Sequence, residues 1–185
     1  MILYIHGFGS CGSGNKVDAL RAEFGEKNVL SPDLPVSPKA AMALLESLIA
    51  EHDIELLVGS SLGGFYAEWL NGRHGIPSVL INPSTRPQET LARYLGENTH
   101  WCTGERYQWT PAHIEELAPF ARSAVPRNEH YLVLLQTDDE VLNYRLAEQR
   151  YARHEVVIEQ GGNHRFENLE DYATRILDFL TQTRG

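Results

Sequence analysis

Short apolar segments alternate along this chain with longer segments in which apolar residues recur every three or four positions. The short segments are rich in Leu, Ile and Val and are bounded by Gly, Pro, Asn or Asp, as strands usually are. They predict strands at residues 2–5, 29–31, 54–59, 78–82, 131–136 and 155–159. Helical spacing is clearest in residues 38–52 and 169–180. This alternation indicates an α/β fold, a reduced and mostly parallel sheet of about six strands with helices on both faces.

Residues 84–128 interrupt the alternation and show no strand pattern. They contain Pro87, Pro111, Pro119 and Pro126 together with Tyr94, Trp101, Tyr107, Trp109 and Phe120. We interpret the segment as a short helical cap over the C-terminal edge of the sheet, where open α/β folds bind their ligands. The aromatic residues either line an acyl or aromatic pocket or form the cap's own small core, and both interpretations stay open.

The length of 185 residues, 42% of them hydrophobic, predicts a single domain over residues 1–185 that includes this cap. The formal net charge of −9 provides no basic field, so nucleic acid and anionic membrane surfaces are not expected partners. No apolar run approaches the roughly 20 residues of a membrane-spanning helix. The chain enters its first strand without a basic leader, so we expect a cytoplasmic protein. In that setting Cys11 and Cys102 are expected to be free thiols.

The most informative motif is Gly59-Ser60-Ser61-Leu62-Gly63, which follows a buried strand and precedes a helix. This Gly-x-Ser-x-Gly pattern is typical of a nucleophile elbow, a sharp turn that exposes a serine oxygen. Ser61 is therefore the candidate nucleophile. The alternative is a Gly/Ser-rich turn that merely joins a strand to a helix.

A serine hydroxyl needs an imidazole to take its proton and a carboxylate to orient that imidazole. An acidic loop, Asp138-Asp139-Glu140, follows the strand at 131–136, and a Gly-rich loop carrying His164 follows the strand at 155–159. The order Ser, Asp, His at successive strand ends is that of α/β-hydrolases. We choose Asp139 as the acid, because Val141 is predicted to begin the next helix two residues later, and keep Asp138 in reserve.

The loop after the first strand, His6-Gly7-Phe8-Gly9-Ser10, occupies the place of an oxyanion-hole loop. We expect the backbone N–H groups of Phe8 and Leu62 to form the hole and His6 to brace the loop, or alternatively to order a substrate or water. The glycines do not follow the spacing of a nucleotide-binding loop, and the histidines form no zinc motif. No cofactor and no metal are therefore expected.

Five segments together resemble the small bacterial YqiA/YcfP-like esterases of the α/β-hydrolase superfamily over nearly the whole chain. They are Tyr4-Ile5-His6-Gly7-Phe8, Val58–Ala67, Ile81-Asn82-Pro83, Asp139–Leu142 and Gly161–Phe166. The resemblance implies a compact sheet, a short cap, and esterase or thioesterase activity. One departure is Thr137-Asp138, where related chains usually show a glycine before the catalytic Asp, and it leaves the choice between Asp138 and Asp139 open.

The residues thus predict a carboxylic-ester hydrolase that acts on a small-molecule ester through an acyl-enzyme. A thioesterase acting on acyl-CoA or an acyl carrier uses the same groups, and cap arginines would then meet a phosphate. A non-catalytic hydrolase-fold binding protein is the alternative from another class, and a peptidase is less favoured. The sequence does not indicate the oligomeric state or the length of the acyl chain.

Overall fold

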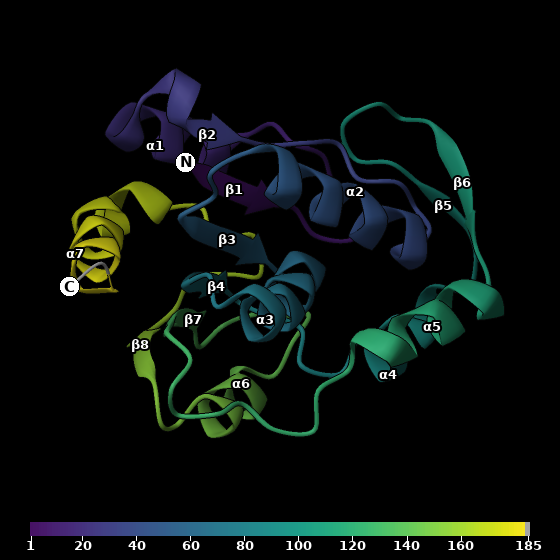
Figure 1. Ribbon diagram of the computed structural model, residues 1–185. Coiled ribbons are helices and arrows are strands. Elements are labelled where there is room, and N and C mark those ends of the chain that lie inside the picture. Colours follow the sequence, from purple (N-terminus) through teal and green to yellow (C-terminus); the bar gives the residue numbers. More distant parts are fainter. Residues whose placement is uncertain (184–185) are drawn as a thin grey trace.

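The computed structural model describes residues 1–183 and is built around one six-stranded sheet (Figure 1). Its strands are β1 (Ile2–Ile5), β2 (Val29–Leu30), β3 (Leu56–Ser60), β4 (Ser78–Ile81), β7 (Tyr131–Gln136) and β8 (Glu155–Glu159). They lie in the order β2-β1-β3-β4-β7-β8, and each pairs with its neighbours in parallel. All six predicted strands are present, with ends shifted by at most two residues, and the predicted α/β class is confirmed.

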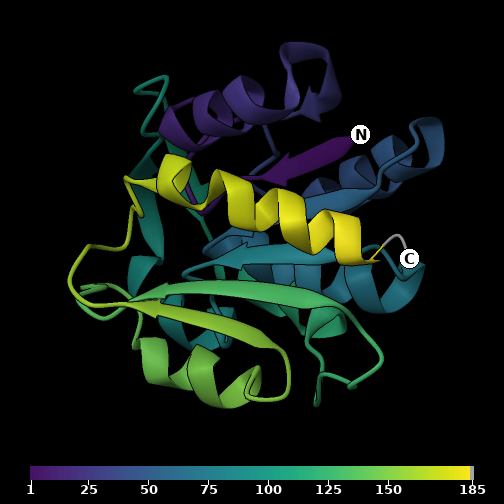
Figure 2. The ribbon, with the colours of Figure 1, turned by 90° about the vertical axis from the view of Figure 1, so that its left-hand side faces the viewer.

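Helices cover both faces of this sheet. They are α1 (Asn15–Phe24), α2 (Pro38–Glu51), α3 (Leu62–His74), α4 (Pro87–Thr90), α5 (Pro111–Leu117), α6 (Tyr144–Arg150) and α7 (Ala173–Thr183). Short 3₁₀ turns are η1 (Glu26–Asn28), η2 (Ala92–Tyr94), η3 (Ala118–Phe120) and η4 (Leu169–Tyr172). Figure 2 shows α1 and α7 side by side on one face, where they contact each other.

Alternate residues of the central strands enter two separate hydrophobic clusters, one on each face. In β3, Leu57 packs with residues of α2, α3 and α6, whereas Val58 packs with residues of α1 and α7. Both side chains are fully buried. This two-residue period is what a parallel sheet covered on both faces requires, and it holds the C-terminal ends of the strands at one rigid edge.

The segment between β4 and β7 is only partly helical, which corrects the predicted helical cap. Besides α4 and α5 it contains an antiparallel hairpin of β5 (Gly96–Thr99) and β6 (Arg106–Trp109). The residues of β5 are polar and largely exposed, so they carry no apolar alternation that sequence reasoning can detect. We keep the name cap for residues 84–128. That the whole chain forms one domain stays a prediction.

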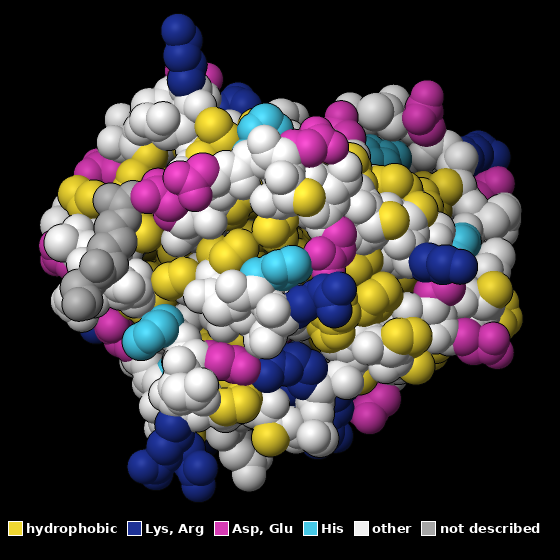
Figure 3. Space-filling view, viewed as in Figure 1, with side chains coloured by type: hydrophobic (Ala, Val, Ile, Leu, Met, Phe, Trp, Pro, Cys, Tyr) yellow, Lys and Arg dark blue, Asp and Glu magenta, His cyan; other side chains and the backbone are white. Residues whose placement is uncertain are grey.

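The surface in the view of Figure 3 shows acidic and basic side chains interspersed rather than gathered into one patch. Within residues 1–183, no helix has the length and apolar character needed to cross a membrane.

Candidate active site

Ser61 lies at a sharp turn between β3 and α3, with φ of 55°, a value that non-glycine residues rarely adopt. Its backbone N–H donates to the carbonyl of Ile81 in β4 at 3.0 Å, which fixes the turn to the sheet. Gly59 and Gly63 approach each other so closely that a side chain at either would collide with neighbouring backbone. The sequence folds into an elbow here because only glycine fits on both sides of the serine.

A continuous chain of hydrogen-bonding groups runs from Ser61 through His164 to Asp139. The Oγ of Ser61 is 3.0 Å from Nε2 of His164, and Nδ1 of the same ring is 2.8 Å from Oδ2 of Asp139. The Asp139 side chain is 1% exposed and the His164 side chain 18% exposed. Because a carboxylate only accepts, Nδ1 carries the proton and Nε2 is free to accept the serine proton. This is the tautomer that a general base needs.

Of the predicted acidic pair, it is Asp139 that meets the imidazole. Its second oxygen, Oδ1, accepts the backbone N–H groups of Val141 at 2.9 Å and Leu142 at 2.7 Å. These bonds close a turn and aim the carboxylate at the ring. The helix α6 begins only at Tyr144, so the expectation that Val141 starts it was wrong. The two N–H groups bond to the carboxylate instead of to a helix.

The two acidic neighbours of Asp139, Asp138 and Glu140, make different contacts. All three residues lie in the loop of residues 137–143, which we call the β7 loop. Asp138 is exposed, and its Oδ1 accepts a hydrogen bond from the Thr137 hydroxyl at 3.3 Å. Glu140 accepts the backbone N–H of His164 at 2.9 Å, and this bond lowers the pKa of the Glu140 carboxyl. Glu140 therefore ties the β7 loop to the main chain of the histidine.

His164 lies in the β8 loop, residues 160–166. The buried side-chain amides of Asn82 and Gln136 form hydrogen bonds with the backbone of this loop. Nδ2 of Asn82 donates to the carbonyl of Asn163 at 3.0 Å and lies 3.4 Å from that of His164. Oε1 of Gln136 accepts the N–H of Asn163 at 3.0 Å, and Gln136 N–H donates to Oδ1 of Asn82 at 3.0 Å. Gly162, with φ of 77°, packs so tightly on the Gln136 side chain that no Cβ fits.

Sequence reasoning assigned no role to Asn82, Gln136 or Glu140. The available signal was the position of the first two, which are polar residues at the C-terminal ends of otherwise apolar strands. Asn82 and Gln136 are 3% and 2% exposed, and a buried amide at a strand end must find partners in the adjoining loop.

The β1 loop, residues 6–14, lies against Ser61, as expected of an oxyanion-hole loop. A Cβ added to Gly7 would come within 3.1 Å of the Ser61 Cβ. Phe8 follows directly in this loop, and Leu62 is the first residue of α3. The N–H of a first helical residue has no carbonyl partner within its helix and is available to an anion.

His6 braces the β1 loop, one of its two predicted roles. Its Nδ1 is 2.8 Å from the carbonyl of Gly7, and its Nε2 accepts the backbone N–H of Leu34 at 2.9 Å. Burial lowers the pKa of His6, which keeps the ring neutral and Nε2 able to accept. The ring thus links the loops that follow β1 and β2.

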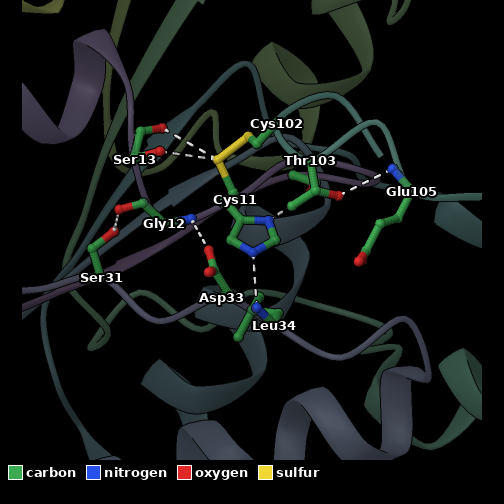
Figure 4. Close-up of a disulfide and its surroundings, with 11 residues drawn as sticks. Cys11, Gly12, Ser13, Ser31, Asp33, Leu34, Cys102, Thr103 and Glu105 are labelled. Carbon is green, nitrogen blue, oxygen red and sulfur yellow. Dashed lines mark hydrogen bonds between the residues drawn. A yellow bond between two sulfur atoms is a disulfide. The ribbon is translucent and has the colours of Figure 1, made fainter. Parts of the chain in front are cut away.

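The two cysteines form a disulfide, contrary to the expectation of free thiols. Cys11 of the β1 loop is bonded to Cys102, which lies in the turn of the β5–β6 hairpin (Figure 4). Their Cα atoms are 6.2 Å apart, well within the usual range. Next to the bridge, the N–H of Trp101 donates to the carbonyl of Gly9 at 2.8 Å. The expectation of free thiols rested on the cellular compartment, and no sequence pattern near either cysteine indicates that the cap hairpin reaches this loop.

The cap aromatics divide between the two predicted roles. Trp109 is 1% exposed and packs edge-on against the ring of Phe8, with 4.9 Å between centroids, so it belongs to a core. Tyr94 and Tyr107 also contact Phe8, but each lines a recess beside the site. Trp101 is 84% exposed and does neither.

Two small recesses flank the candidate site. The first, which we call the serine recess, is lined among others by Ser61, Ser84, Arg93, Tyr94, Val141 and Leu142. The second is lined among others by His6, Phe8, Tyr66, His100 and Tyr107. Leu62 borders both, so a substrate carbonyl near its N–H has space on either side. Within residues 1–183, no group of three His, Cys, Asp or Glu residues is arranged to hold a metal ion.

Comparison with known proteins places the chain in a family. A family model described as an uncharacterised protein family, UPF0227, matches residues 1–181. The chain belongs to this family. UPF0227 protein YcfP from Escherichia coli O9:H4 (strain HS) is 26% identical over 196 residues, which cover 98% of this chain and 99% of that protein. The resemblance to YcfP-like proteins is therefore confirmed.

Solved structures identify the fold of this UPF0227 protein. Est1E from Butyrivibrio proteoclasticus matches with a TM-score of 0.76 and 15% identity, covering 98% of this chain and 87% of that one. Alpha/beta hydrolase domain-containing protein 10 from mouse matches with a TM-score of 0.72 and 19% identity, covering 98% and 89%. The predicted α/β-hydrolase fold is confirmed.

Proposed function

We propose that this UPF0227 protein is a serine hydrolase that cleaves carboxylic esters of small-molecule substrates. The observation that carries the proposal is the unbroken line of contacts from the Ser61 hydroxyl through His164 to the buried carboxylate of Asp139. A half-buried serine on a strained turn, an imidazole within hydrogen-bonding distance of it and an orienting acid are together what an activated nucleophile requires.

In the proposed reaction, Nε2 of His164 takes the proton of Ser61 as Oγ attacks the ester carbonyl. The carbonyl π bond breaks, and its electron pair becomes an oxyanion that the N–H groups of Phe8 and Leu62 stabilise. As the C–O bond to the alcohol breaks, the protonated His164 returns its proton to the leaving oxygen. A water molecule, deprotonated by the same nitrogen, then hydrolyses the acyl-enzyme and releases the acid.

The fold supports an ester substrate by analogy with solved esterases that share it. Est1E has also been solved with bound ferulic acid, and a carboxylic acid is the kind of product that an ester hydrolase releases. Thioesters are the second substrate class, because the same steps apply with sulfur as the leaving atom. No cofactor enters the proposed reaction, and a cytoplasmic location remains our expectation.

Labelling with a fluorophosphonate, followed by intact mass spectrometry, tests the proposal without knowledge of the natural acyl group. We expect one adduct on the parent protein and none on folded Ser61→Ala. Esters and thioesters of matched acyl length then measure kcat/KM. No adduct on folded parent protein, or an adduct that persists in Ser61→Ala, would refute the proposed nucleophile.

The acid is tested with two isosteric variants in the same loop. Asp139→Asn removes the charge that fixes the His164 tautomer and should lower kcat/KM by as much as ~10⁴-fold. Asp138→Asn changes the same functional group on an exposed neighbour and should leave kcat/KM within about twofold of the parent. Equal losses in the two variants would contradict the assignment of Asp139.

A further inference from the structure

Arg93 differs in its contacts from three other arginines of the cap. Arg86, Arg106 and Arg122 each pair with a carboxylate, at 3.7, 3.2 and 2.5 Å from Glu89, Glu97 and Glu129. Among the described residues, Arg93 has no such ion pair. Its positive charge is therefore not neutralised locally, although the chain as a whole carries a net charge of −9.

The guanidinium of Arg93 is nevertheless held in place. Nε donates to the carbonyl of Thr90 at 3.1 Å, and Nη2 donates to the carbonyl of Val141 in the β7 loop at 3.1 Å. The group also stacks over the ring of Tyr94, 5.3 Å from the centroid. These contacts bridge the cap and the β7 loop and leave Arg93 lining the serine recess together with Ser61. A fixed, unneutralised guanidinium beside a nucleophile is a site for an anion.

Beside Arg93, the serine recess contains a polar group that lacks a hydrogen-bond partner in the described part of the chain, the hydroxyl of Ser84. Ser84 is 5% exposed, and its Oγ is a buried atom with no hydrogen-bond partner within residues 1–183. Its backbone N–H donates to the carbonyl of Ser61 at 3.0 Å, which fixes the residue beside the nucleophile. Leaving a buried hydroxyl unpaired destabilises the structure, and this cost is recovered when a ligand oxygen accepts its hydrogen bond.

We propose that the serine recess binds an anionic oxygen group of the substrate, a carboxylate or a phosphate, through Arg93 and the hydroxyl of Ser84. This inference rests on the proposed function, since it names the substrate class of the same site. The recess is small, so the anion lies only a few bonds from the ester carbonyl. One source that fits is a short dicarboxylic acid esterified at one end, and the other is a leaving alcohol that carries a phosphate.

Matched pairs of esters test the proposal and distinguish the two sources. The first pair is an aryl monoester of succinic acid and the butyrate ester of the same phenol, which differ by an anion in the acyl part. The second pair is the butyrate esters of a short phosphorylated alcohol and of its unphosphorylated form. We expect the anionic member of at least one pair to have a kcat/KM roughly 10- to 100-fold higher than that of its neutral partner. This factor is what one charge-assisted hydrogen bond contributes to binding.

Substitution of Arg93 should abolish this preference. Arg93→Gln should lower the ratio of kcat/KM for the anionic ester to kcat/KM for the neutral ester by the same roughly 10- to 100-fold, mainly through the KM of the anionic ester. Arg93→Lys should retain part of the preference. Arg106→Gln is the matched control, because it removes an equal charge from the exposed cap hairpin. Ser84→Ala should weaken binding of the anionic ester several-fold.

The outcomes separate this inference from the proposed function. Failure of Ser61 to react with the fluorophosphonate refutes the proposed function itself. If Ser61 reacts and the parent hydrolyses the neutral and anionic members of both pairs with equal kcat/KM, the anion site is refuted and the hydrolase proposal stands. The same holds if Arg93→Gln and Arg106→Gln change kcat/KM for the anionic ester by the same factor. Thermal unfolding of Arg93→Gln and Arg93→Lys establishes that both variants are folded.

Discussion

Replacement of Asn82 by Asp tests whether Asn82 positions His164 or only contributes to the stability of the fold. The substitution is isosteric, so Oδ1 still accepts the N–H of Gln136. The other atom changes from a donor to an acceptor and then faces the carbonyl of Asn163, which the native amide contacts at 3.0 Å. A hydrogen bond becomes a repulsive contact between two oxygens at a position only 3% exposed.

The expected loss of stability follows from these contacts. Loss of one hydrogen bond costs about 1 kcal/mol net, and the buried carboxylate oxygen that replaces the amide nitrogen, left without a donor, adds about 1–3 kcal/mol. We therefore expect Asn82→Asp to lower the free energy of unfolding by roughly 2–4 kcal/mol, which for a chain of this size lowers Tm by about 4–16 °C. The second effect is on the β8 loop. A shift of His164 by about 1 Å relative to Ser61 should slow fluorophosphonate labelling by up to ~100-fold in protein that is still folded.

Urea unfolding measures the first effect, and the labelling rate at a temperature well below the Tm of the variant measures the second. Asn143→Asp is the control. Asn143 is exposed, and its Oδ1 accepts the N–H of Arg145 at 3.1 Å, a bond that an aspartate keeps. This control should stay within about 0.5 kcal/mol of the parent. A folded Asn82→Asp that labels at the parental rate would show that Asn82 does not position His164.

Two further outcomes concern the loop against Ser61. Burial lowers the pKa of His6, so the unfolded chain binds a proton at higher pH than the folded chain. The contribution of His6 to the free energy of unfolding is therefore present above about pH 6.5. It is lost on acidification at up to about 1.4 kcal/mol per pH unit. Urea unfolding of the parent and His6→Gln at several pH values measures this loss, and parallel curves would contradict it. Removal of the disulfide in Cys11→Ser/Cys102→Ser should lower the free energy of unfolding by about 2–4 kcal/mol. A reductant should cause the same loss in the parent and have no effect on the variant. A reductant that destabilises both proteins equally would overturn the expectation.

The strands and the order of the site residues could be predicted because they follow from local patterns. Apolar runs bounded by turn residues identify buried parallel strands, and parallel strands bring their C-terminal ends to one edge. Ser61, Asp139 and His164 each follow such an end, so their proximity follows from topology. It is Asp139 whose carboxylate contacts the imidazole of His164, and its role as the acid stays a prediction. The reason given for choosing it, a helix that begins at Val141, was wrong, because α6 begins at Tyr144. The N–H groups of Val141 and Leu142 donate to the Asp139 carboxylate and so form a turn. Side-chain bonds of this kind also occur at the start of a helix, so the sequence pattern of the turn resembles that of a helix N-terminus.

The cap was harder to predict because its structure depends on contacts distant in sequence. The strand β5 has no apolar face of its own, and the hairpin is fixed by Trp109 against Phe8 and by the bridge from Cys102 to Cys11. These partners lie 91 or more residues apart, and no periodicity within the cap encodes them. Residues that pair only across such distances give no local signal, which is why a pair of cysteines was interpreted from the expected compartment alone.

These long-range contacts converge on the β1 loop, and this convergence links the fold to the proposed chemistry. One side of the loop lies against Ser61 through Gly7, and the other side is held by His6 on Leu34 and by the disulfide. An N–H group stabilises an oxyanion only if it already points at the oxygen before charge develops. The β1 loop has no helix or long strand to fix it, so contacts from the cap and from the loop after β2 must supply that rigidity. The cap therefore does more than cover the serine recess, because it also holds the loop that carries the proposed Phe8 donor.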